Sequence, residues 1–406
     1  MILCRVGIRF SIGMIFWILC CIDNAVAFSK INNKKMSFLF AGMKNDDIHV
    51  STNLIPKIFA FNDLRSVTST QIISLFALSI LSYQVWAQAD FSNSFITIPL
   101  TQLDGAYYAN YTICDDTFRG IVDTGSPFLI VPSICTKFWG CRTAANSARA
   151  RDTSYTHTVE VYGGQDYDVD WKCGDLEFGN FKQKNVVFAS VGSDILLPPG
   201  GVFIGLVKYK ESDIRPTLLG QLNYSSLRFD TISKTLSLSK FPLLPRKWSS
   251  SVLALVDLRP FGDPVFHYAV KVKRLELNGK PIGATTANSN CTIYAIFDTG
   301  TTGCVLSDDL MNDWDTPNPV RSVKVVAESE TGDEISFEQR ATRKNIFVVT
   351  AGKIEWFQSS SHAAVVAGDE RVSKLDNSVQ VVILGAIFMR DKVLTIDIED
   401  GRLQLV

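Results

Sequence analysis

Two copies of an Asp-Thr-Gly motif are the residues in this chain whose types and spacing best suit chemistry. The segment GIVDTGS (residues 120–126) is repeated in the second half of the chain as AIFDTGT (residues 295–301). In each copy an apolar run enters the motif and another leaves it, a pattern that predicts a buried strand, a tight glycine-containing turn and a second buried strand. Each copy is therefore expected to present one acidic side chain, Asp123 or Asp298, on a turn between buried strands.

A pair of facing carboxyl groups could carry out hydrolysis without any other catalytic group. Burying a carboxylate is costly unless donors or a partner compensate, and two like charges at close range do not both ionise easily, so one keeps a proton. The ionised carboxylate can take a proton from a bound water while the protonated one polarises a carbonyl. If the two halves pack about a pseudo-twofold axis, Asp123 and Asp298 form such a pair, and Thr124 and Thr299 brace the turns by hydrogen bonds across the axis.

Other catalytic chemistries have little support in the sequence. The chain has four histidines and contains no zinc-binding Cys/His pattern, no GxSxG motif and no Gly-rich phosphate loop. A formal net charge of −1 and a charged fraction of 20% argue against nucleic-acid binding and against disorder. We therefore expect no metal, no cofactor and no nucleic-acid partner.

The duplication extends beyond the motif and predicts two β-rich halves. FD at residues 229–230 is followed by LSL at residues 236–238, and ID at residues 396–397 is followed by LQL at residues 403–405, with the same spacing. The segment SKFPLLPRKWSSS (residues 239–251) contains the proline and serine residues typical of a boundary. The predicted halves are residues 90–245 and residues 246–406.

Two apolar segments precede these halves. Residues 1–27 combine early arginines, an apolar run and a small-x-small triplet, which is typical of a secretory signal peptide. Residues 72–87 (IISLFALSILSYQVWA) carry no charge and are either cleaved or retained as a membrane tether. Residues 28–89 are expected to be a non-core targeting or linker region. Whether this region contains an inhibitory pro-segment, and whether translation starts at Met36 or Met43, stay open.

Cysteines and glycosylation sequons indicate the compartment. Three sequons, at Asn110, Asn223 and Asn290, together favour a glycosylating, oxidising lumen. An even count of six cysteines after residue 89 suits disulfides, with buried thiols as the alternative. We expect a secretory, endomembrane or extracellular location, with multi-step import into a plastid lumen as the alternative. The six cysteines are Cys114, Cys135, Cys141, Cys173, Cys291 and Cys304.

From about residue 91 to the C-terminus the chain resembles the pepsin-like aspartic proteases. IVDTGSPFLIVPS (residues 121–133) resembles the first active-site motif of that family, and IFDTGTT (residues 296–302) resembles the second. CTKFWGC (residues 135–141) is similar to the small disulfide loop that follows the first motif, and residues 383–406 are similar to the C-terminal signature. The resemblance implies an all-β, mostly antiparallel, bilobal fold with a pseudo-twofold axis and a cleft between the lobes.

The resemblance also implies roles for individual residues. Asp123 and Asp298 would be catalytic, and a disulfide would join Cys135 to Cys141. The hydroxyls at the fourth position of each motif would hydrogen-bond the outer carboxylate oxygens, and the motif glycines would let substrate and water approach closely. The residues supporting the two turns would be Thr124, Gly125, Ser126, Thr299, Gly300 and Thr301.

Two further elements of that family have counterparts here. The flap, a hairpin that covers the substrate, is predicted around Tyr162 and Gly163, and Ile130 replaces the tryptophan that usually binds the flap tyrosine, which predicts a more mobile flap. Apolar-apolar-Gly segments that support the turns would be residues 383–385 and residues 203–205. The rival in the first half, residues 218–220, lies in PTLLGQL, which resembles a helix of the family.

These features predict an aspartic endopeptidase that hydrolyses peptide bonds in peptides or proteins lying extended in the cleft, and that acts as a monomer. A catalytically silent relative that binds proteins or inhibitors through the same cleft is the alternative; the intact acids disfavour it and the altered flap slightly favours it. A membrane-tethered β scaffold with purely structural Asp turns is a third reading.

Overall fold

The computed structural model describes residues 94–406 with several gaps, and all of these residues belong to one compact unit. The predicted signal peptide (residues 1–27), the non-core region (residues 28–89) and its apolar segment (residues 72–87) lie outside the described residues. Within the described part, no helix has the length and hydropathy needed to span a bilayer. The gaps are residues 144–145, 147, 156, 163–164, 193–200, 209–215, 248, 262, 264, 284–290, 308–309, 311–319, 342–348 and 352–378.

Nearly all regular secondary structure in the described residues is β-strand, arranged in mostly antiparallel sheets, which confirms the predicted all-β class. The helical elements with described bounds are α4 (Leu218–Leu222) and a 3-10 turn, η3 (Arg259–Phe261). α4 begins after Thr217, whose hydroxyl accepts a hydrogen bond from Gly220 N, and ends at Asn223 in the left-handed conformation. Both are favoured helix caps.

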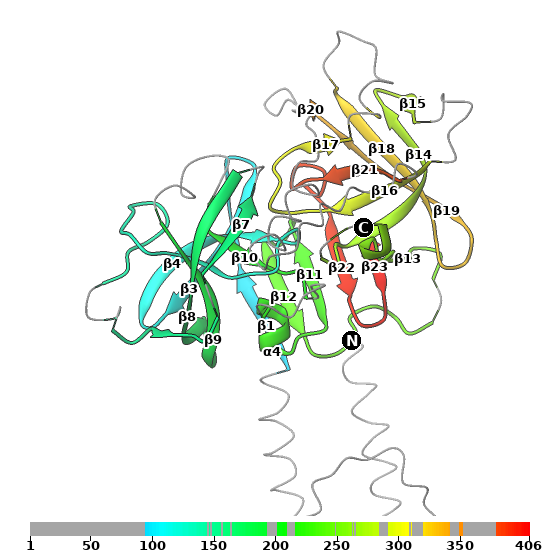
Figure 1. Ribbon diagram of the computed structural model, residues 1–406. Coiled ribbons are helices and arrows are strands. Elements are labelled where there is room, and N and C mark those ends of the chain that lie inside the picture. Colours follow the sequence, from blue (N-terminus) through cyan, green and yellow to red (C-terminus); the bar gives the residue numbers. More distant parts are fainter. Residues whose placement is uncertain are drawn as a thin grey trace, which may run out of the picture. The chain divides into compact units, whose positions relative to one another are not determined.

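A nine-stranded sheet in the described first half carries the first Asp-Thr-Gly turn (Figure 1). Its order is β10-β4-β3-β8-β9-β5, with β2 paired to β3 and with β6 and β7 paired to β8. The last four residues of β4 are all buried, as expected for an apolar strand with neighbours on both edges. The strands are β2 (Thr101–Leu103), β3 (Ala106–Ile113), β4 (Asp116–Asp123), β5 (Ile130–Pro132), β6 (Arg151–Asp152), β7 (Thr158–Tyr162), β8 (Gln165–Phe178), β9 (Phe181–Val191) and β10 (Phe203–Gly205).

An eight-stranded sheet in the described second half carries the second turn. Its order is β19-β18-β14-β16-β21-β17-β20, with β15 paired to β14. The last five residues of β16 are buried, which repeats the pattern of β4. The strands are β14 (Ala269–Leu277), β15 (Lys280–Ile282), β16 (Thr292–Phe297), β17 (Cys304–Leu306), β18 (Ser322–Glu328), β19 (Glu334–Arg340), β20 (Val349–Ala351) and β21 (Val379–Leu384).

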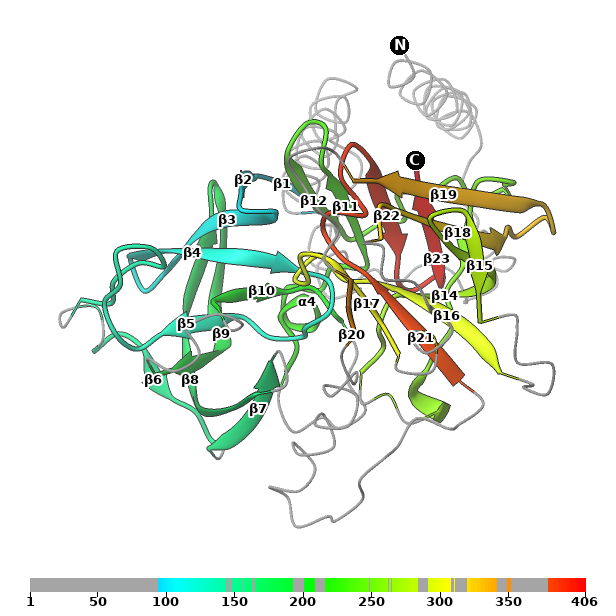
Figure 2. The same ribbon diagram turned by 90° about the horizontal axis from the view of Figure 1, so that it is seen from above.

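The two halves share a third sheet, with the order β1-β12-β11-β22-β23-β13 in the described residues. The repeated FD…LSL and ID…LQL segments form its two central hairpins, which Figure 2 shows side by side. β11 pairs antiparallel with β22, with Arg228 opposite Thr395, so the hairpins are related by an approximate twofold axis. The predicted boundary segment connects β12 to β13. The strands are β1 (Phe95–Pro99), β11 (Ser226–Asp230), β12 (Thr235–Ser239), β13 (Leu253–Ala254), β22 (Val393–Asp397) and β23 (Arg402–Leu405).

Each Asp turn is supported by a parallel neighbouring strand. β10 lies beside β4 with Gly205 opposite Asp123, and β21 lies beside β16 with Leu384 opposite Phe297. Of the two candidate supports in the first half, residues 203–205 therefore occupy this position, and the rival segment forms α4. This confirms the preferred assignment, and each turn has a parallel strand as its neighbour.

One hydrophobic core extends through both halves of the described chain. Its fully buried aromatic side chains include Tyr111 and Phe188 from the first half and Phe297 and Phe388 from the second. The hydroxyl of Tyr111 donates to Ile130 O at 2.6 Å, which fixes the chain that leaves the first turn. A buried tyrosine hydroxyl needs such a partner, so this contact also determines how β3 packs on β5.

Candidate active site

The two Asp-Thr-Gly turns pack directly against each other. A Cβ atom placed on Gly125 would lie 2.6 Å from the carboxyl carbon of Asp298, and one placed on Gly300 would collide equally with that of Asp123. A real Cβ essentially never approaches another atom so closely. The two glycines therefore make room for the opposite carboxyl group, a role that the sequence analysis had assigned to the approach of substrate and water.

Four hydrogen bonds between the two threonines and the opposite backbone hold the turns together. Thr124 N donates to Thr299 Oγ1 and Thr299 N donates to Thr124 Oγ1, both at 3.0 Å. Each hydroxyl then donates onward, Thr124 Oγ1 to Phe297 O at 2.7 Å and Thr299 Oγ1 to Val122 O at 2.6 Å. Both threonine side chains are completely buried. The expected bracing across the axis is thus present as a reciprocal pair.

The two carboxyl groups have unequal surroundings although the turns are similar. Asp298 accepts hydrogen bonds from Gly300 N (2.9 Å), Thr301 N (3.3 Å) and Thr301 Oγ1 (2.7 Å). Asp123 accepts one from Gly125 N at 2.7 Å. Burial raises the pKa of Asp123 well above its ordinary value, and the charge of Asp298 and a hydrogen bond with it raise that pKa further. The raised pKa favours the protonated form of Asp123, and Asp298 accepts more hydrogen bonds from its own turn than Asp123 does from its turn.

The fourth residue of each motif accounts for this difference. Thr301 forms the hydrogen bond to the outer carboxylate oxygen that the sequence predicted. The corresponding hydroxyl of Ser126 is buried and forms no hydrogen bond of standard geometry with a described residue, although the interaction of its side chain with Asp123 lowers the pKa of that carboxyl. The two hydroxyls therefore differ in geometry, and Thr301 forms the closer contact with its carboxylate.

A segment of the second half that the sequence analysis did not single out reaches both turns. His267 Nε2 lies 3.0 Å from Gly125 O, and His267 Nδ1 lies 2.7 Å from an oxygen of Asp263. The next residue, Tyr268, donates its hydroxyl to Leu206 O, and its own carbonyl accepts from Phe297 N at 3.1 Å. The only sequence signal for this segment is one histidine inside the apolar run VFHYAV (residues 265–270).

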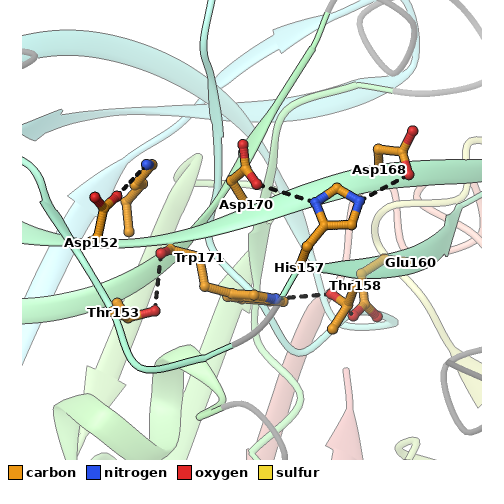
Figure 3. Close-up of polar contacts among 9 residues, drawn as sticks. Asp152, Thr153, His157, Thr158, Glu160, Asp168, Asp170 and Trp171 are labelled. Carbon is orange, nitrogen blue, oxygen red and sulfur yellow. Dashed lines mark hydrogen bonds and ion pairs between the residues drawn. The ribbon is translucent and has the colours of Figure 1, made fainter. Parts of the chain in front are cut away.

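The predicted flap corresponds to the hairpin formed by β7 and β8. Tyr162 is the last residue of β7 and pairs with Gln165, the first of β8; Gly163 lies outside the described residues. The hairpin has an internal polar chain (Figure 3), in which Trp171 Nε1 donates to Thr158 Oγ1 at 2.8 Å and Thr158 Oγ1 donates to buried Glu160 at 3.0 Å. No motif in the sequence marks Trp171, Thr158 or Glu160 as interacting residues.

Trp171 also joins the hairpin to the first turn. Its indole packs edge-on against Phe128, with ring centroids 5.0 Å apart, and Phe128 follows the first motif by two residues. Edge-to-face aromatic pairs of this kind add roughly 0.5–1.5 kcal/mol beyond the burial of area. Trp171 on β8 therefore links the described hairpin to the first Asp-Thr-Gly turn through Phe128. Ile130 stands where the resembled family has the tryptophan that binds the flap tyrosine.

The outer face of the same hairpin carries a histidine between two carboxylates. His157 Nδ1 lies 3.1 Å from Asp170 and Nε2 lies 3.0 Å from Asp168 (Figure 3). The hydrogen bonds to Asp170 and Asp168 raise the pKa of His157. All three side chains are exposed, so water screens this cluster and its contribution to stability is small.

The cysteines follow the prediction only in part. Cys135 and Cys141 are joined by a disulfide, whereas Cys114, Cys173, Cys291 and Cys304 carry thiols. Of the two expectations for the six cysteines, disulfides thus hold for Cys135 and Cys141, and the alternative of thiols holds for the other four. Cys114 Sγ lies against Gly174, so it faces the side of β8 opposite to that of Cys173, because successive residues of a strand alternate between its faces.

Two of the three sequons fall on described residues. Asn110 and Asn223 are exposed, as a glycosylated asparagine must be. Asn290 lies outside the described residues. Among the residues that the structure describes, no cluster of three or more His, Cys, Asp or Glu side chains is placed to hold a metal ion.

No model of a known protein family matches the chain, and no curated protein matches it in sequence.

Proposed function

We propose that this protein is an aspartic endopeptidase of the pepsin-like type, in which Asp123 and Asp298 activate a water molecule. The observation that carries the proposal is the crossed arrangement of the two turns: each carboxyl group lies against the glycine of the opposite turn, and the threonines exchange hydrogen bonds. Two buried acids on symmetry-related turns have no evident structural purpose, because burying them together costs free energy.

The unequal surroundings of the acids suggest how they would divide the work. Asp298, with three donors, would be the carboxylate that takes a proton from the attacking water. Asp123, with its raised pKa, would donate its proton to the carbonyl oxygen of the peptide as the water oxygen bonds to the carbonyl carbon. When the C–N bond breaks, Asp298 would return the proton to the leaving amine, and Asp123 would recover its own from the carbonyl-derived hydroxyl.

The substrate in this proposal is a peptide or protein segment in extended conformation, and the enzyme acts as a monomer. A secretory or endomembrane location is supported by the N-terminal sequence, the Cys135–Cys141 disulfide and the exposed Asn110 and Asn223. Residues 72–87 would be the membrane tether if they are retained.

The test is cleavage of an unfolded protein by the purified full chain from acid to neutral pH. We expect cleavage with an acidic optimum, and Asp123→Asn or Asp298→Asn should each reduce it by about 10²–10⁴-fold or more while leaving the circular dichroism spectrum unchanged. Asp230→Asn is the matched control, because Asp230 caps a turn far from the motif. Full activity in either dyad variant would refute the mechanism, and an inactive wild type would favour a silent binding protein.

A further inference from the structure

His267 and Asp263 form a buried pair that contacts the first turn at Gly125 and has no part in the proton transfers proposed above. Both side chains come from the segment between η3 and β14, and both are almost completely buried. His267 Nδ1 lies 2.9 and 2.7 Å from the two oxygens of Asp263. On the other side of the ring, His267 Nε2 lies 3.0 Å from the carbonyl oxygen of Gly125.

The partners of the ring determine which nitrogen donates to the first turn. The carbonyl oxygen of Gly125 can only accept a hydrogen bond, so Nε2 carries a hydrogen and donates it. On the other side of the ring, both oxygens of Asp263 lie within reach of Nδ1, and Asp263 Oδ1 also accepts from Val265 N at 3.0 Å. Asp263 therefore holds the ring in the orientation that points Nε2 at Gly125.

The residue that His267 holds is the one that sets the position of Asp123. Gly125 accepts from His267 through its carbonyl, and its N–H donates to Asp123 Oδ1 at 2.7 Å. The segment that carries His267 also contacts Asp123 through Leu206. The hydroxyl of Tyr268 donates to Leu206 O, and Leu206 N donates to Asp123 O at 2.8 Å. The segment therefore constrains the first turn at two points.

In the described residues, no histidine or other side chain bridges to the second turn in this way. There the hydroxyl of Thr301, which belongs to the turn itself, orients Asp298. Asp298 is oriented by both groups of Thr301, while Asp123 accepts from the Gly125 N–H of its own turn and the Ser126 hydroxyl forms no hydrogen bond of standard geometry with a described residue. With fewer direct donors, the orientation of Asp123 depends more on how firmly Gly125 is held.

We propose that His267, held in place by Asp263, is a positioning residue for Asp123: it fixes the carbonyl of Gly125 and, through that residue, the direction in which Asp123 presents its proton. This inference rests on the proposed function for its kinetic consequence. The bridge itself can be tested without any activity. A displacement of about 1 Å at a reacting group can lower the rate roughly 10²-fold, so the effect should be measurable.

The first experiment is an NMR spectrum of the full chain labelled with ¹⁵N-histidine. The chain has four histidines, and the spectrum of His267→Phe identifies the signal of His267. We expect Nε2 of His267 to carry a hydrogen that exchanges slowly with solvent, because the ring is buried and this nitrogen donates to Gly125 O. His157 is the internal comparison, because its ring is exposed and should exchange its hydrogens rapidly. A His267 ring without a hydrogen on Nε2 would overturn the proposed bridge.

The second experiment compares turnover of a peptide substrate. His267→Phe should lower kcat about 10- to 100-fold and change KM much less, because the bridge orients a reacting group rather than binding substrate. The double variant Asp263→Asn with His267→Gln can rebuild an uncharged bridge, in which the Asn amide donates to Gln and the Gln amide donates to Gly125 O. It should recover most of the lost kcat. Glu328→Gln, which removes an exposed ion pair with Lys273, is the control and should behave as the wild type.

The outcomes separate the two proposals. A wild-type chain that cleaves no peptide would refute the proposed function alone, and the NMR spectrum would still show whether the bridge exists. An active wild type with unchanged kcat in His267→Phe would overturn the positioning role. If His267→Phe fails to fold, the double variant decides: no gain in kcat over Asp263→Asn alone would count against the bridge.

Discussion

The hydrogen bonds between the turns can be tested through stability, independently of any enzymatic activity. Thr299→Val keeps the shape of the side chain and removes its hydroxyl, which leaves Val122 O without its donor and Thr124 N without its acceptor. Each buried polar group left unpaired costs about 1–3 kcal/mol. The variant should therefore lower the free energy of unfolding by about 2–6 kcal/mol, the sum for these two groups.

Equilibrium unfolding in urea measures this change. Thr299→Ser keeps the hydroxyl and loses one methyl group, so it should lower the free energy of unfolding by only about 1 kcal/mol. Thr97→Val on β1 is the matched control, since Thr97 is exposed and its hydroxyl contacts only Ser237 at 3.2 Å in the described residues; it should change the free energy of unfolding by less than about 0.5 kcal/mol. A Thr299→Val variant as stable as this control would refute the inference that the two turns are joined through buried threonine hydroxyls.

Three further outcomes follow from the described contacts. Gly300→Ala should abolish proteolysis, since its Cβ would collide with the carboxyl group of Asp123; turnover equal to the wild type would show that the turns are not so close. His157→Gln should destabilise the protein more at acidic than at alkaline pH. The pKa of His157 is raised in the folded state, chiefly by Asp170, so the stabilisation that this histidine provides is complete below pH 6.5 and is lost as the pH rises through the raised pKa. Urea unfolding of both proteins below and above this pH range measures the difference. An equal loss of stability at both pH values would contradict the prediction. Burial raises the pKa of Cys304 to about 12, so a pulse of iodoacetamide on the native protein should leave Cys304 unmodified by mass spectrometry, and rapid labelling would show that it is accessible.

Much of the candidate site could be read from local pattern. An apolar strand that enters Asp-Thr-Gly and another that leaves it describe a buried acidic turn whatever surrounds them, and the second copy points to its symmetric partner. The repeats at residues 229–238 and 396–405 likewise predicted two matching hairpins, because alternation and a short polar turn are local signals. The same local signals predicted two β-rich halves, and the family resemblance added the all-β class.

The pairing of distant groups could not be predicted in this way. His267 lies 142 residues from Gly125 in the chain, and no motif marks it as a neighbour of the first turn. The thiols of Cys114 and Cys173 illustrate the same limit, since an even number of cysteines suits disulfides but the face of β8 from which each side chain projects decides whether they can meet.

The sequence by itself determined that this protein is all-β, that it is internally duplicated and that each half presents one acid on a glycine turn, because these properties depend on residue type and short-range spacing. Only the tertiary structure decided that the two acids are unequal. Thr301 reaches Asp298 while Ser126 does not form the matching bond with Asp123, and the first turn is instead held through Gly125 by His267. Such differences arise from contacts between segments far apart in the chain, whose geometry is fixed only when the sheets pack.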